Sequence, residues 1–174
     1  MQRVRTALAD LRTGELQATS DYGDGTQAVV TMQFRLPDTN SPNRPQPAVY
    51  SQTTYTSPHG SQRTEHLSVG EQSWERDSAD EPWRPVPEQE GAYAQVAAFL
   101  PQLPAPEDPT LVPDQPGSEL RWLDRARDAD VTLRVGEGGV PELFRRTARN
   151  GTAVLTVTYS QWNTPVSIPD PPSP

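Results

Sequence analysis

The closing stretch of the chain, AVLTVTYSQWNTPVSIPDPP at residues 153–172, gives the strongest indication of the fold. Leu155, Val157 and Tyr159 alternate with polar residues, and a period of two is typical of a β-strand with one buried face. Trp162 follows where the alternation ends, and the prolines after it exclude a further central strand. We therefore predict that this strand closes the sheet at an edge and that the Trp162 ring covers one end of the core.

The same alternation recurs through most of the chain. Residues 15–36 read as two strands joined by a tight hairpin at Gly23–Gly25, where Asp-Gly favours the required positive φ. Residues 48–78 read as three further strands, and residues 130–162 as a closing three-strand meander. The second strand of the first hairpin has an apolar face, which we expect to be buried: Ala28, Val30, Met32, Phe34 and Leu36.

Two short helices interrupt the strands. The first is indicated by apolar residues spaced i, i+3, i+4 and i+7, namely Val4, Ala7, Leu8 and Leu11. Gly14 is placed to end it. The second is indicated by a similar stripe, Tyr93, Val96, Ala97 and Leu100. Pro101 ends this helix, because proline removes a backbone donor and clashes with the preceding turn.

The remaining segments are less regular. Residues 101–116 carry six prolines and predict a long extended loop. Residues 119–126 fit neither the helical nor the strand period. We expect a single domain at residues 1–168, followed by a proline-rich tail at residues 169–174.

Composition excludes several functions. The 174 residues include 15 lysines and arginines against 23 aspartates and glutamates, a formal net charge of −8. Such a charge repels phosphate backbones, so we expect no nucleic-acid partner. The chain has no cysteine, which removes disulfides, thiolate nucleophiles and cysteine-ligated zinc.

No catalytic or metal-binding pattern is present in the sequence. The two histidines, His59 and His66, are seven residues apart, and on its strand His66 shares a face with Thr64 and Ser68 but with no carboxylate. Metal ligands usually occur at denser spacing. The sequence also has no GxSxG motif and no phosphate-binding GxxxxGK[ST] loop. We therefore predict no enzyme activity, no cofactor and no metal.

Five stretches together resemble the LolA/LolB and LppX/LprG superfamily of extracytoplasmic lipoprotein carriers and lipid-binding lipoproteins. They are residues 5–22, 28–38, 69–83, 130–147 and 156–172. The resemblance implies an α+β fold with a strongly curved antiparallel β-sheet, an unclosed barrel. A short N-terminal helix and one or two helices would cover its concave face. It also implies a location outside the cytoplasm, periplasmic or at the cell surface, with membrane anchoring in the full-length form.

Two functions fit these observations. The first is a non-catalytic domain that holds a hydrophobic ligand, a lipid or an acyl chain, between the sheet and its helices. The alternative is a sensor or scaffold ectodomain that has a filled core and binds a protein partner at the membrane; exposed Trp83 or Trp162 would favour it. A cavity of several hundred Å³, about the usual size of ligand pockets, would favour the first. The residues expected to bind its ligand are Val30, Met32, Phe34, Trp74, Phe99, Leu100, Trp122, Leu155 and Val157.

Overall fold

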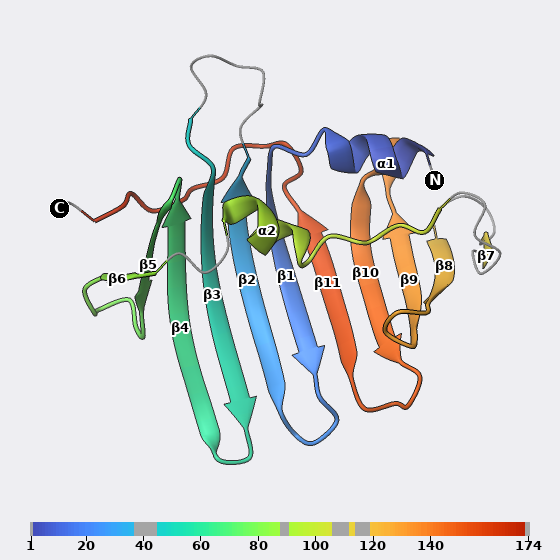
Figure 1. Ribbon diagram of the computed structural model, residues 1–174, viewed down its shortest axis with the longest axis horizontal. Coiled ribbons are helices and arrows are strands. Elements are labelled where there is room, and N and C mark those ends of the chain that lie inside the picture. Colours follow the sequence, from blue (N-terminus) through green and yellow to red (C-terminus); the bar gives the residue numbers. More distant parts are fainter. Residues whose placement is uncertain (1, 37–44, 88–90, 106–111, 114–118, 173–174) are drawn as a thin grey trace.

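One antiparallel sheet forms the body of the protein (Figure 1). The computed structural model describes residues 2–36, 45–87, 91–105, 112–113 and 119–172. Within these residues the strands are β1 (Thr13–Asp21), β2 (Gln27–Arg35), β3 (Ala48–Ser57), β4 (Gly60–Val69), β5 (Gln72–Arg76), β6 (Arg84–Val86), β7 (Val112–Pro113), β8 (Glu119–Asp124), β9 (Ala129–Val135), β10 (Pro141–Ala148) and β11 (Val154–Ser160). Their order across the sheet is β6-β5-β4-β3-β2-β1-β11-β10-β9-β8-β7.

The sheet consists of two meanders that meet at β1 and β11. β1 pairs with β2 on one side and with β11 on the other, and Leu16 lies opposite both Met32 and Tyr159. Our prediction that the last strand forms an edge is therefore wrong, because β11 lies between β1 and β10 in the middle of the sheet. A central position suits its sequence, since β-branched and aromatic residues favour paired, buried strands.

The two edges of the sheet, β6 and β7, do not pair with each other in the part of the chain that the structure describes. All ten described strand pairings are antiparallel. The predicted α+β fold with an unclosed antiparallel sheet is confirmed. The segment at residues 119–126, which fitted neither period, contributes strand β8. The proline-rich loop contains the two-residue edge strand β7, a position where proline is tolerated.

Two helices, α1 (Gln2–Ala9) and α2 (Ala92–Ala97), lie on the same face of the sheet, which we call the inner face (Figure 1). α1 ends before Leu11, which is nevertheless buried, and α2 ends before Leu100. After α2 the chain continues through two shorter turns, in which Phe99 and Leu100 donate to carbonyls three residues earlier. Neither described helix is long and apolar enough to cross a membrane.

The hydrophobic core lies between the inner face and the helices. α1 contributes Val4, and α2 contributes Ala92 and Val96. The alternation of the strands directs their apolar residues to the same side, as the sequence predicted. The strand residues of the buried cluster are Leu16, Ala18, Met32, Phe34, Val49, Trp122, Val131, Leu133, Val135, Phe144, Val157 and Tyr159.

Trp162 packs against this core just beyond the end of β11. Its indole Nε1 donates a hydrogen bond to the Pro141 carbonyl oxygen at 2.7 Å, and its ring centre lies 5.7 Å from that of Tyr159. The next residue, Asn163, joins the chain to the start of β1: its backbone N–H donates to the Thr13 carbonyl oxygen at 2.8 Å, and its Oδ1 accepts from the Arg12 N–H at 2.7 Å.

We expect Trp162→Ala to lower the free energy of unfolding by about 3 kcal/mol, because truncation of a packed aromatic side chain leaves a cavity. Trp162→Phe keeps most of the packing and loses the hydrogen bond, so it should cost only about 1 kcal/mol. Urea denaturation measures both values. A chain shortened after Ile168 is the control and should unfold like the wild type. A near-silent Trp162→Ala would contradict the structural role of the ring.

Candidate ligand-binding site

The largest described pocket on the inner face has a volume of about 520 Å³. It lies between strands β2 to β5 and the C-terminal end of α2. The lining residues are Val30, Met32, Ser51, Thr53, Thr64, His66, Glu75, Gln95, Ala98 and Phe99. We call it the first pocket.

The first pocket exists because the side chains on this part of the sheet are short. Strand register places two rows of residues side by side on the inner face: Val30, Thr53 and Thr64 in one, and Met32, Ser51, His66 and Glu75 in the other. Ser51, Thr53 and Thr64 have short side chains, so space remains above them. On the other half of the sheet, large side chains such as Leu133 and Phe144 pack into the core, and a further hollow of about 500 Å³ lies beside Val4, Leu120 and Val135.

α2 is attached to the sheet at the side of this pocket. The Gln95 Nε2 donates a hydrogen bond to the Ser68 Oγ at 3.0 Å, and the Ser68 and Ser73 hydroxyls are hydrogen-bonded at 2.9 Å. Both serines are buried, so this pairing satisfies polar groups that water does not reach. Val96 packs into the core from the same helix.

His66 and Glu75 form the polar wall of the first pocket. They lie directly opposite each other on β4 and β5. Burial lowers the pKa of His66, and the charge of Glu75 opposes this effect only in part. On its own strand His66 shares a face with Thr64 and Ser68, as expected from the sequence. The carboxylate of Glu75 comes from the neighbouring strand β5.

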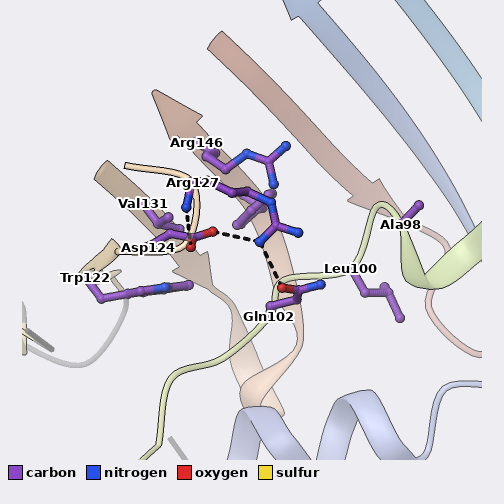
Figure 2. Close-up of a pocket in the computed structure, with 9 residues that line it drawn as sticks. Ala98, Leu100, Gln102, Trp122, Asp124, Arg127, Val131 and Arg146 are labelled. Carbon is purple, nitrogen blue, oxygen red and sulfur yellow. Dashed lines mark hydrogen bonds and ion pairs between the residues drawn. The ribbon is translucent and has the colours of Figure 1, made fainter. Parts of the chain in front are cut away.

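A second pocket, of about 200 Å³, lies on the other side of the segment that follows α2 (Figure 2). Its apolar lining is Ala98, Leu100, Trp122, Val131 and Phe144, and its polar lining is Gln102, Asp124, Arg127 and Arg146. The Arg127 Nη1 lies 3.0 Å from the Asp124 Oδ2 and donates to the Gln102 Oε1 at 3.1 Å. These contacts join the segment after α2 to the turn between β8 and β9.

A third pocket, of about 300 Å³, adjoins the second one. It is lined by Ser20, Asp21, Tyr22, Arg127, Ala129, Arg146, Ala148, Ala153, Val154 and Leu155. The second and third pockets share Arg127 and Arg146, and the first and second share Ala98. The three hollows therefore adjoin one another along the inner face.

The predicted ligand-binding residues are distributed unevenly among these hollows. The first pocket contains Val30, Met32 and Phe99, the second Leu100 and Trp122, and the third Leu155. Phe34 and Val157 are buried in the core and line none of the three. Trp74 lies on the opposite, outer face. It follows Ser73 in β5, and the Ser73 hydroxyl is hydrogen-bonded to Ser68 on the inner face beneath α2.

Sequence reasoning missed the polar lining. The alternation of β3 and β4 already places Ser51, Thr53 and Thr64 on the apolar face of the neighbouring strands. Arg146 is two residues from Phe144 in β10, so period two also predicts that it faces inward. These residues were overlooked because polar and charged side chains are usually read as exposed.

The outer face carries a separate cluster around Glu65, which is 0% exposed. Its carboxylate accepts from Arg76 Nε at 2.8 Å, Arg63 Nη2 at 2.8 Å and the Tyr50 hydroxyl at 3.1 Å. Burial raises the pKa of Glu65, but these hydrogen bonds outweigh it and hold the pKa below its ordinary value. The Arg76 guanidinium stacks 4.4 Å from the ring centre of Trp83, so this tryptophan is a packed part of the cluster.

Comparisons with known proteins identify the fold. No family model matches the sequence, and no curated protein matches it either. Two solved structures share the architecture over nearly the whole of both chains. LprF from Mycobacterium bovis superposes with a TM-score of 0.58 at 13% identity, covering 99% of this chain and 96% of LprF. The Mycobacterium tuberculosis lipoprotein LppX superposes with a TM-score of 0.52 at 12% identity, covering 97% and 95%.

The protein therefore belongs to the class of half-barrels, in which an open antiparallel sheet carries helices on one face. The strand order and the three hollows on the inner face define this class here. Within that class it has the fold of LprF and LppX, the LppX/LprG fold. The resemblance inferred from the sequence is confirmed at the level of the fold.

The lowered pKa of His66 predicts a pH dependence of stability. The unfolded chain takes up a proton near the ordinary pKa of 6.5, whereas folded His66 resists protonation, so stability falls as the pH drops through that value. His66→Gln should lose less stability than the wild type between neutral and mildly acidic pH, as measured by urea denaturation. The control is His59→Gln, in the exposed turn between β3 and β4. Equal losses in all three proteins would contradict the burial of His66.

Proposed function

We propose that this domain is a non-catalytic binding protein that holds a lipid or an acyl chain on the inner face, between the sheet and α2. The observation that carries the proposal is the first pocket. Its volume of about 520 Å³ lies within the range of about 300–1,000 Å³ that is usual for small-molecule sites.

The lining chemistry supports an apolar ligand. Val30, Met32 and Phe99 provide apolar surface, and methionine adapts its shape to irregular or variable ligands. Three of the six polar residues of the first pocket, Ser51, Thr53 and Thr64, carry uncharged hydroxyls, which border an acyl chain without demanding a partner of opposite charge. In the described ranges no group of three or more histidines, aspartates and glutamates is placed to hold a metal ion.

The proposal includes a location outside the cytoplasm and anchoring to a membrane in the full-length form. It is supported by the fold shared with LppX, which is described as a lipoprotein. Ligand binding in the first pocket would not depend on the anchor, because every lining residue of this pocket belongs to this domain.

The alternative, a sensor or scaffold ectodomain with a filled core, is less well supported. An exposed Trp83 or Trp162 would have favoured this alternative. Trp83 packs edge-on against Tyr50 with ring centres 6.4 Å apart, and Trp162 packs against the core. The exposed large hydrophobic residues among those described are three tyrosines at separate sites, Tyr22, Tyr55 and Tyr93.

Filling the first pocket should abolish ligand binding. Thr53→Phe places an aromatic ring in the space beside Val30 and Thr64, and phenylalanine is well tolerated in strands. We expect it to weaken the binding of a neutral fluorescent acyl probe at least about 10-fold, the effect of removing little more than 1 kcal/mol of apolar burial. The matched control is Thr54→Phe, one residue along β3 and on the outer face.

Native mass spectrometry of gently purified protein provides an independent measurement. The proposal predicts a bound apolar mass on the wild type and on Thr54→Phe, and its absence on Thr53→Phe. A wild-type protein that carries no such mass and binds no acyl probe would overturn the proposal. A probe that binds both variants equally well would place the site elsewhere.

A further inference from the structure

Arg146 is an unusual residue for the inner face. It lies on β10, opposite Leu155 of β11 and Val131 of β9, on the same side of the sheet as Phe144. Its neighbours along and across the strands are therefore apolar. The Arg146 side chain is partly exposed, and it lines both the second and the third pocket.

The Arg146 guanidinium has no hydrogen bond or close ion pair in the part of the chain that the structure describes. Burial lowers the pKa of Arg146, as does the charge of Arg127, and Asp124 opposes them. A guanidinium carries five N–H donors in a planar fork, and those of Arg146 are available to an acceptor on a ligand. The pocket thus holds a cation with unused hydrogen-bonding capacity.

Arg127 adds a second cation to the same place. Figure 2 shows the guanidinium groups of Arg127 and Arg146 extending towards the same side of the second pocket. Asp124 is engaged by Arg127 at 3.0 Å. The carboxylate of Asp21, at the third pocket, accepts from the Gly23 N–H at 2.9 Å in the exposed turn after β1. Two guanidinium groups therefore face the second pocket with one carboxylate, a local positive excess in a chain of net charge −8.

We propose that Arg146 and Arg127 bind the anionic group, a phosphate or a carboxylate, of an amphiphile whose apolar chain lies along the inner face into the first pocket. This inference deepens the proposed function and rests on it. Guanidinium groups suit such anions because their N–H donors match the oxygens in pairs. The apolar residues around Arg146 lower the local dielectric constant, which strengthens the interaction.

The distance between the two ends suits an acyl chain. From Arg146 in β10 to Val30 in β2 the inner face crosses three strand spacings, about 14 Å at the usual separation. Of the β1 side chains between the two ends, Ala18 is buried in the core, and Ser20 is a small residue that lines the third pocket. In Figure 1 neither helix lies over the lower half of these strands, near the β1–β2 and β10–β11 turns. One long acyl chain can span this distance with its anionic end at the arginine pair.

Two ligands with the same chain and different ends test the inference. Oleoyl lysophosphatidic acid and monooleoylglycerol share their acyl chain and glycerol, and only the first carries a phosphate. We expect the wild type to bind the lysophosphatidic acid about 10-fold more tightly, as charge-assisted hydrogen bonds from guanidinium predict. Displacement of the neutral fluorescent acyl probe gives both affinities.

Arg146→Gln should abolish this preference, because it removes the guanidinium that binds the phosphate. Arg127→Gln should reduce the preference as well. The matched control is Arg145→Gln, because Arg145 is the neighbouring residue on β10, is exposed and faces the outer side. Arg145→Gln should keep the full preference for the phosphate-bearing ligand.

The outcomes separate this inference from the proposed function. If both ligands bind equally well to the wild type, the arginine pair does not bind the anionic group and this inference is wrong, although the domain still binds acyl chains. If neither ligand binds, the proposed function and this inference are both wrong. If inorganic phosphate alone displaces the lysophosphatidic acid as effectively as the intact amphiphile does, the site recognises a free anion, and the inference of an amphiphile is overturned.

Discussion

The pairing of β1 with β11 is the interaction on which the rest of the structure depends. It joins the first half of the chain to the second over seven residue pairs, from Glu15 with Ser160 to Asp21 with Val154. Without it the protein would be two separate meanders, each with one apolar face and no common core. Because the pair lies in the middle of the sheet, it also fixes the distance between the first pocket on one meander and the arginine pair on the other. Its formation requires contacts far apart in sequence, which are slow to form in folding.

Side-chain size then divides the inner face into a filled and a hollow part. Around β8 to β10, Trp122, Leu133 and Phe144 belong to the buried cluster, and the second pocket beside them has a volume of only about 200 Å³. Around β3 and β4, serine and threonine leave the larger one. The backbone is similar on both sides, so the division arises from composition. A domain with 33% hydrophobic residues has few large apolar side chains to cover so wide a sheet.

The sequence predicted the elements of this fold better than their arrangement. Alternation at Val30, Met32 and Phe34 revealed a strand because one face of it is buried, which is a local property of the chain. The central position of β11 was not predictable in this way, since pairing between distant strands depends on the whole molecule. For the same reason the opposition of His66 and Glu75 appeared only in the structure. In β8, Leu123 lies on the outer face beside an inward Trp122, and this mixed pattern explains why its period was unclear.

The attachment of α2 has a consequence for the exchange of any bound molecule. This helix has six residues, too few to be stable alone, so it persists through Val96 and through the hydrogen bond of Gln95 to Ser68. Detaching it breaks few contacts, whereas separating β1 from β11 breaks a full ladder. Opening above the pocket therefore requires less free energy than global unfolding. For a ligand bound as we propose, affinity and residence time are then set by different parts of the fold. The side chains of the sheet determine the affinity, and the short helix determines the rate of release.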